Sequence, residues 1–242
     1  ENRIGWLVSI DALLYALIFL LIYWAFGLEI CGVAMLMWST GYPWHYDWTG
    51  GSFGRVPWLF MTTLGVCALK RGLPFLGGAA ITWAMLLRLF PGAFIAGVTA
   101  KIVYGCVQFF RGKQSVFMTK EHWRVTLGCT TALVGLVLCS LFVVGNFGAY
   151  GEFYDNTMKH KQTKLTDHMG LPTMISYHPD HVGKKKKRAR LDDPWSLWKQ
   201  HRKDNLQNRK LLHYGLILGL FGLLMYIGRR RSDWEVTSLS AL

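Results

Sequence analysis

Charged residues are scarce in this chain of 242 residues, where they make up 17% of the sequence against 52% for hydrophobic residues. A soluble domain carries about a quarter charged residues. The charges are also unevenly placed, because residues 1–150 hold 10 of the 27 Lys and Arg and 5 of the 14 Asp and Glu. This composition excludes an ordinary soluble domain. It predicts an apolar, membrane-embedded block over residues 1–150 and a basic segment after it.

Cysteine pairs at the spacing of metal or redox sites are absent. The five cysteines lie within or beside apolar stretches, as small buried hydrophobic residues do. A disulfide framework would place them in polar loops. We therefore expect neither disulfides nor a zinc site at these positions: Cys31, Cys67, Cys106, Cys129 and Cys139.

The signatures of the familiar enzyme classes are absent as well. The sequence contains no phosphate-binding glycine loop, no HExxH and no GxSxG. We expect no catalytic residue, no resident cofactor and no metal. The net charge of +13 is typical of nucleic-acid-binding proteins. Basic residues that flank membrane spans explain it better, so we expect no nucleic-acid partner.

Three apolar runs are clear membrane spans. They cover Ile4–Leu28, Val125–Tyr150 and Leu211–Gly228. About 20 apolar residues cross a bilayer core, and even the shortest run reaches about 27 Å as a helix. Arg229, Arg230 and Arg231 end the third run sharply.

The stretch between residues 56 and 110 admits two interpretations. Val56–Leu69 is a short or tilted span, or a helix in the interface. Gly72–Phe110 is too long for one straight span, and Pro91–Gly92 marks a turn or a kink near Arg88. For Gly72–Phe110 we favour two spans, with one long kinked helix as the alternative.

The positive-inside tendency supports the two-span interpretation. It places the 69–72 turn, the 111–124 loop and the tail from Arg229 on one side, with six crossings and both termini on that side. The predicted fold is therefore all-α, a multi-pass transmembrane protein of five to six spans with one extended basic extramembrane segment. We divide it into a transmembrane block (1–150), an arm (151–210), a final span (211–228) and a tail (229–242).

The polar arm is expected to be irregular except near its end. Asp193 before Pro194 is a favourable helix start and predicts an amphipathic helix over residues 194–210, with Trp195, Trp198 and Leu206 as apolar anchors. The 40 residues before it show no hydrophobic periodicity. Between the first two spans, Trp38–Trp48 is dense in Trp and Tyr and indicates an interfacial loop, or a binding lip for a quinone, a pigment or a lipid.

Two basic clusters predict contact with anionic lipid, such as cardiolipin, or with an acidic partner subunit. One lies in the arm and the other follows the last span. Their residues are Lys184, Lys185, Lys186, Lys187, Arg188 and Arg190, and Arg229, Arg230 and Arg231.

Charges inside the membrane are candidates for function. Asp11 lies about two turns into the first span and serves as a proton relay, as a partner of Arg88 or Lys101, or as an interfacial group. Arg88 lies at the surface if the chain turns there. If the helix continues, Arg88 is deep and needs an acid, Asp11 or Glu29.

Two histidines at span edges, His122 and His213, are the candidates for haem ligation. In the favoured topology they lie at opposite membrane faces, because a complete span and a loop separate them. One iron cannot bind both, so we expect no haem. A redox subunit that binds haem or quinone stays an alternative.

Small residues four apart predict close helix packing in lipid. In the last span they are Gly215, Gly219 and Gly222. Earlier in the chain they are Ala93 and Gly97, Ala96 and Ala100, and Gly128 and Ala132. Several spans with small faces are typical of a protein packed among many neighbours.

We therefore expect a non-catalytic accessory subunit of a large membrane complex. Its partners are other membrane subunits and anionic lipids. The missing initiator Met, the basic flanks and the short Trp-rich spans favour the mitochondrial inner membrane, in a respiratory-chain complex or ATP synthase. A small transporter or channel is the alternative, although the spans offer little polar lining.

Overall fold

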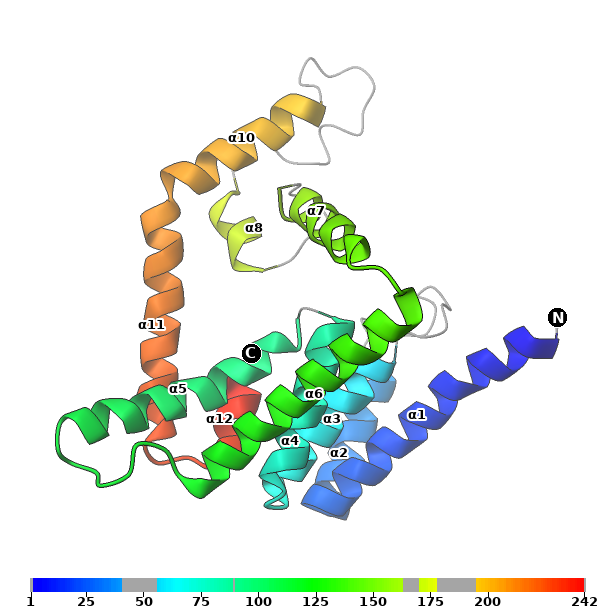
Figure 1. The fold of residues 1–242 in the computed structure, drawn as a ribbon, viewed down its shortest axis with the longest axis vertical. Helices are drawn as coiled ribbons and strands as arrows, with labels where there is room; N and C mark the ends of the chain where they lie inside the picture. The colour runs from blue at the N-terminus through cyan, green and yellow to red at the C-terminus, as the bar shows by residue number, and fades with distance from the viewer. Residues whose placement is uncertain (1, 41–55, 89, 163–169, 178–194, 242) are drawn as a thin grey trace. The chain divides into compact units, whose positions relative to one another are not determined.

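The computed structural model describes residues 2–40, 56–88, 90–162, 170–177 and 195–241, and every regular element among them is an α-helix (Figure 1). The described chain forms two compact units, residues 1–140 with 222–242 and residues 141–221. The helices of the first unit are α1 (Asn2–Phe26), α2 (Leu28–Thr40), α3 (Pro57–Lys70), α4 (Pro74–Leu87), α5 (Gly92–Phe110), most of α6 (Lys120–Val144), the end of α11 (Lys210–Gly228) and α12 (Asp233–Leu239).

The expected all-helical membrane fold is confirmed, but the count of five to six spans is not. Four described helices are long and apolar enough to cross a membrane, namely α1 from Ser9 onward, α5, α6 and α11. The α3 and α4 helices have 14 residues each. A helix of that length rises about 21 Å, which is short of a hydrocarbon core of about 30 Å.

The first helix ends before the predicted Leu28. It stops at Phe26, and Gly27 follows with a φ of 88°, a left-handed conformation that glycine adopts without strain. The α2 helix then runs back along α1, so that the rings of Tyr15 and Trp38 lie 5.2 Å apart. This second helix is not among the elements predicted from the sequence, because a single glycine between two apolar segments carries no polar signal.

The predicted break near Arg88 is confirmed. The α4 helix ends at Leu87, Arg88 is extended with φ −148° and ψ 135°, and Pro91 precedes the first residue of α5. The alternative of one kinked helix is therefore wrong. The span predicted over Val125–Tyr150 is displaced, since α6 covers Lys120–Val144 and ends before Gly145, whose φ is 66°.

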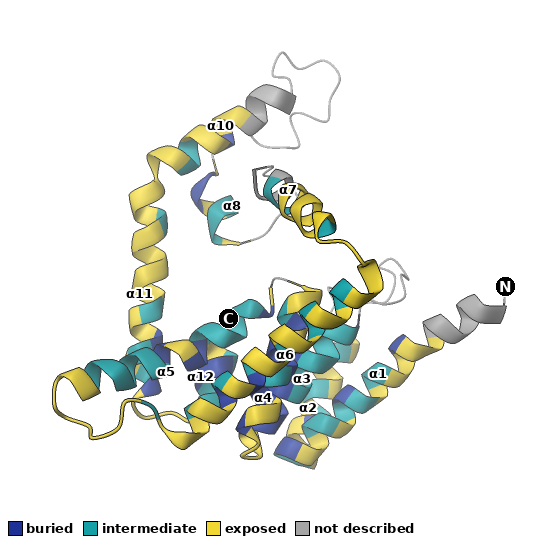
Figure 2. Cartoon of the chain, in the orientation of Figure 1, coloured by how far each residue is buried: buried dark blue, intermediate teal, exposed yellow. Residues whose placement is uncertain are grey.

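The core of the first unit lies between α3, α4, α5 and α6. Leu69, Ile81, Val98 and Val125 are its buried hydrophobic residues. Figure 2 shows these buried positions on the inner faces of the lower helices, with exposed residues on their outer faces. The helices approach closely where glycine faces backbone, because a Cβ on Gly128 would overlap the carbonyl of Phe75. Gly78 meets the carbonyl of Val125 in the same way.

The second unit is more ordered than the sequence indicates. It contains α7 (Gly148–Gln162), α8 (Leu171–Ile175), α10 (Trp195–Asn208) and the first part of α11. The amphipathic helix predicted over 194–210 is present as α10. The expectation of irregular backbone before it is wrong for residues 148–162, because a polar helix satisfies its own backbone without an apolar stripe.

In the second unit, an arginine joins α10 to α8. Arg202 on α10 is 7% exposed, and it donates to the hydroxyl of Ser176 at 3.1 Å and to the carbonyl of Thr173 at 2.6 Å. Burial lowers the pKa of Arg202 below its ordinary value. Arg209 donates to the carbonyl of Ile175 at 2.9 Å. The two arginines thus donate to carbonyl groups of α8, and the carbonyl of Thr173 also accepts from the hydroxyl of Ser176.

Substitution on α6 tests the glycine contact. Gly128→Val should lower the free energy of unfolding by about 1–3 kcal/mol, because the added methyl groups would meet the backbone of α4. Gly135→Val on the same helix is the matched control, since no atom lies within 4 Å of a Cβ there. Thermal unfolding in detergent measures both. Equal losses in the two variants would contradict the close approach of α4 and α6.

Candidate functional site

The polar centre of the first unit lies where α5, α6 and α12 meet. After α11 ends, Ser232 precedes α12, and its backbone N–H donates to Glu235 Oε2 at 2.9 Å. Its hydroxyl donates to the same oxygen at 2.7 Å, and Arg231 pairs with Glu235 Oε1 at 3.1 Å. These hydrogen bonds, from Ser232 first, lower the pKa of Glu235. The chain thereby turns into α12 at a defined residue.

The α12 helix is held against α5 by close backbone packing. Val236 and Thr237 have no exposed surface. A Cβ on Gly97 would overlap the carbonyl of Val236, so only glycine allows this approach. Ala100 is fully buried on α5 as well. The small-residue face predicted at Ala93 and Gly97 therefore packs against the short C-terminal helix.

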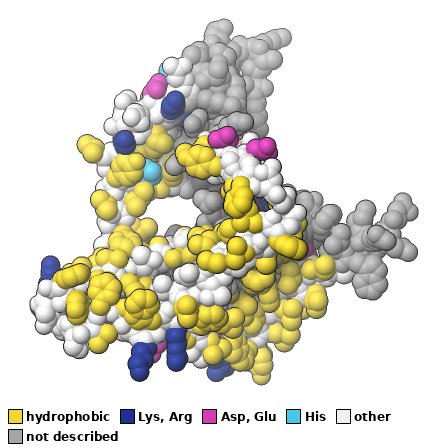
Figure 3. Space-filling model, viewed as in Figure 1, with side chains coloured by type: hydrophobic (Ala, Val, Ile, Leu, Met, Phe, Trp, Pro, Cys, Tyr) yellow, Lys and Arg dark blue, Asp and Glu magenta, His cyan; other side chains and the backbone are white. Residues whose placement is uncertain are grey.

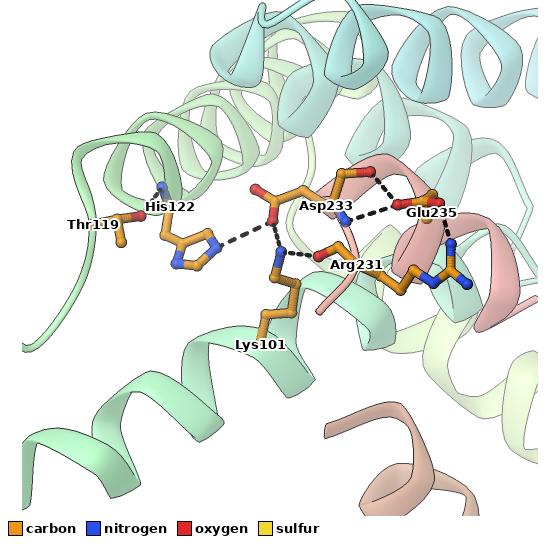
Figure 4. Close-up of polar contacts among 7 residues, drawn as sticks. Lys101, Thr119, His122, Arg231, Asp233 and Glu235 are labelled. Atoms are coloured by element: carbon orange, nitrogen blue, oxygen red, sulfur yellow. Dashed lines mark hydrogen bonds and ion pairs between the residues drawn. The ribbon is translucent and has the colours of Figure 1, made fainter. Parts of the chain in front are cut away.

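Asp233 is the centre of the site (Figure 4). Its Oδ1 lies 2.5 Å from Nζ of Lys101 on α5 and 3.5 Å from Nε2 of His122 on α6. Lys101 also donates to the carbonyl of Arg231 at 2.8 Å. The side chain of Asp233 is 20% exposed, that of Lys101 16% and that of His122 12%. One carboxylate oxygen thus joins three elements that are far apart in the sequence.

The charge on Asp233 is stabilised by its partners. Burial raises the pKa of Asp233, but the hydrogen bonds from His122 and Lys101 and their positive charges outweigh it, and the pKa falls from 3.8 to about 2. The carboxylate therefore stays ionised at neutral pH. It acts as a structural acceptor rather than as a proton donor.

A cation–π contact and an aromatic contact join α12 to α3 and α1. Lys70, the last residue of α3, lies 4.4 Å from the ring of Trp234 and 5.7 Å from that of Phe26. Phe26 and Trp234 meet edge to face at 5.2 Å. Arg71 donates to the carbonyl of Trp24 and lies over its ring. Such cation–π contacts are typical of a partly buried interface.

The structure brings the three predicted basic segments together around α12. Lys70 represents the 69–72 turn, His122 the 111–124 loop and Arg231 the tail, and each contacts α12 or the residues leading into it. The end of α1 lies there too, through Phe26. Because α1 leads toward this end of the unit, its first residues lie at the other end. The expectation that both termini lie on the same side of the membrane stays a prediction.

The intramembrane charges predicted from the sequence are not brought together. Asp11 is 6% exposed, and its Oδ1 has no hydrogen-bond partner within the described chain. Arg88 is exposed at the end of α4. No ion pair between Asp11 and Arg88 occurs among the residues that the structure describes.

The other predicted residues are distributed as follows. His122 lies at the site, whereas His213 belongs to the second unit, where its ring lies 5.5 Å from that of Tyr214. The expectation that these two histidines hold no haem stays a prediction. Arg229 lies 4.2 Å from the ring of Tyr226. Arg230 is exposed. The basic cluster of the arm, residues 184–190, and most of Trp38–Trp48 lie outside the described residues.

The glycines of the last span differ from those of α5 and α6. A Cβ added at Gly215, Gly219 or Gly222 would have no atom within 4 Å beyond the neighbouring backbone of its own helix. Within its own unit, the described part of the chain therefore does not cover the positions that the sequence marks for close packing.

Asp233, Lys101 and His122 form a cluster of polar contacts that holds α5, α6 and α12 together, and we call these three residues the clasp. Within the described ranges, no group of three or more His, Cys, Asp and Glu side chains is placed to hold a metal. Comparison with known protein families, with curated proteins and with solved structures gives no match. The function has to be argued from the geometry.

Removal of the charge at Asp233 tests the clasp. Because folding lowers the pKa of Asp233, its stabilisation is complete above about pH 4 and is lost as the pH falls toward 2. Asp233→Asn should lower the free energy of unfolding at pH 7 by on the order of 2 kcal/mol, and this difference should shrink below pH 4. Arg230→Gln is the exposed control. A difference that persists unchanged to pH 2 would contradict the clasp.

Proposed function

We propose that this chain is a non-catalytic subunit of a larger complex in a membrane, with the mitochondrial inner membrane as its location. The observation that carries the proposal is the bare face of α11. Gly215, Gly219 and Gly222 lie on one face, and no described residue of their own units comes within 4 Å of a Cβ added there, whereas Gly97 and Gly128 meet backbone directly. Small residues on a span permit close approach of another helix.

The exposed apolar surface supports the same proposal. Of the apolar windows of the four long helices, only 6–17% of the residues are buried within the chain. Figure 3 shows hydrophobic side chains over much of the visible face of the first unit. In water such a surface would aggregate, so lipid tails and partner helices have to cover it.

The site at Asp233 defines the membrane surface in this proposal. Three successive arginines, Arg229 to Arg231, are costly inside the bilayer, each by about 2.5–3.5 kcal/mol at its centre, and belong at the headgroups. Lys101 and His122 contact the same segment or Asp233 beyond it. The first turn of α6 and the midpoint of α5 are therefore at headgroup level.

This placement makes α5 a helix along the membrane surface, while α1, α6 and α11 cross. Lys101 is at the middle of α5, so half of a crossing α5 would extend beyond the headgroups. The end of α5 and the loop after it carry a cluster of phenylalanines with rings 5.7–6.2 Å apart, namely Phe109, Phe110 and Phe117. Phe110 is 79% exposed, and Arg111 follows it. Aromatic rings beside cations are typical of the bilayer interface.

Spin labels test the orientation of α5. In a variant without native cysteines, Thr99→Cys and Leu133→Cys place a nitroxide at the middle of α5 and of α6, both at exposed positions. If α5 lies along the surface, the label at Thr99 should be reached mainly by a water-soluble relaxation agent and the label at Leu133 mainly by oxygen. Equal depth at the two positions would show that α5 crosses.

Native electrophoresis tests the subunit proposal. After gentle solubilisation, the chain should migrate in a defined assembly well above its own mass and co-fractionate with inner-membrane markers. Gly219→Leu should release it from that assembly without changing its own unfolding temperature, because none of the residues that the structure describes lies within 4 Å of a Cβ at this position. Leu218→Met on the same helix is the control. A wild-type chain that migrates as a monomer would refute the proposal.

A further inference from the structure

Two cavities follow one another along the crevice between α5 and α6. The first, of about 260 Å³, lies between α5, the 111–119 loop, the start of α6 and the residues after α11. The second, of about 180 Å³, lies between α4, α5 and α6. Ile102 lines both of them. The two cavities are thus neighbours that share one wall residue of α5.

The first cavity is polar and basic. Four basic side chains line it, namely Lys101, His122, Arg229 and Arg231. Two acidic side chains, Glu121 and Asp233, line it as well. The ammonium group of Lys101 donates to Asp233 and to the carbonyl of Arg231, so one of its three N–H donors is still available. The pairs of Lys101 with Asp233 and of Arg231 with Glu235 hold these two cations beside the cavity that they line.

The second cavity is apolar. Its wall on α5 is made by Ile95, Val98 and Ile102, which recur at three- and four-residue spacing on one face. On α6, Val125 and Cys129 continue the face that begins with His122 at the polar end. A hydrocarbon chain that enters beside Ile102 would meet only such walls, apart from the hydroxyl groups of two threonines.

We propose that this crevice binds one anionic phospholipid, with its phosphate at the polar cavity and part of one acyl chain in the apolar cavity. The proposal rests on the membrane location argued above. Its support is charge complementarity at the headgroup level together with an apolar continuation of the same crevice. A free anion would use the first cavity only, whereas phosphatidylcholine carries a quaternary ammonium beside its phosphate and so brings no net negative charge to the cations of the polar cavity.

The test compares lipids on the purified chain in nanodiscs. Phosphatidylglycerol in a phosphatidylcholine background should bind at least about tenfold more tightly than phosphatidylcholine itself, measured by native mass spectrometry of the retained lipid and by the unfolding temperature. Lyso-phosphatidylglycerol should bind as well, because only one chain enters the crevice. Inorganic phosphate alone should not compete at the concentrations that saturate the lipid.

Matched variants locate the site. Arg229→Gln should weaken retention of phosphatidylglycerol by about tenfold, since charge-assisted hydrogen bonds to phosphate are lost. Arg230→Gln removes the same charge from the neighbouring residue, which does not line the polar cavity, and should have little effect. Ile95→Phe should fill the apolar cavity and reduce retention. If that variant does not fold, the arginine pair still decides the question.

Three outcomes would overturn the proposal: equal effects of the two arginine variants, equal binding of phosphatidylcholine, or full competition by inorganic phosphate. The result is separable from that for the subunit proposal. Arg229→Gln should lose the lipid while the assembly on native gels persists. Loss of the assembly in the wild-type chain with the lipid retained would refute the proposed function and leave the lipid site standing.

Discussion

A single carboxylate oxygen, Oδ1 of Asp233, receives Lys101 from α5 and His122 from α6. Much of the first unit depends on this contact because α12 is only seven residues long and could not hold a position alone. Once the clasp and the close packing on Gly97 fix α12, Trp234 reaches Lys70 and Phe26. The ends of α1 and α3 are therefore positioned by the same short helix.

The energetics of the clasp follow from its partial burial. Removing Asp233 from water opposes its ionisation, and two cationic partners more than compensate for that cost. Such a group is better suited to fixing structure than to exchanging protons. The same place gathers basic residues from three segments and, in our proposal, lies at the membrane surface. In that proposal, the basic residues beside the clasp are also the ones that bind the phosphate of an anionic lipid.

Local signals in the sequence were enough for several elements. Pro91 and Gly92 act on the backbone of their own segment, so the break between α4 and α5 is predictable. The same holds for the final span and for α10. The second helix and α7 were not predicted, because a one-residue turn at Gly27 does not interrupt the apolar run and a polar helix produces no hydrophobic period. The Ser232-x-x-Glu235 capping pattern before α12 is readable in the sequence, and it is the signal that could have identified this helix.

By itself, the sequence determined that the chain is helical and membrane-embedded, since the composition and length of apolar runs act locally on the partition between water and lipid. It also marked Gly97 and Gly128 as small positions, but not which elements they face. The tertiary structure alone decided that Lys101 and His122 share Asp233, because these residues are more than 100 positions apart from it in the chain. Ion pairs over such separations leave no periodic trace, as they depend on how the helices pack and not on the residues beside them.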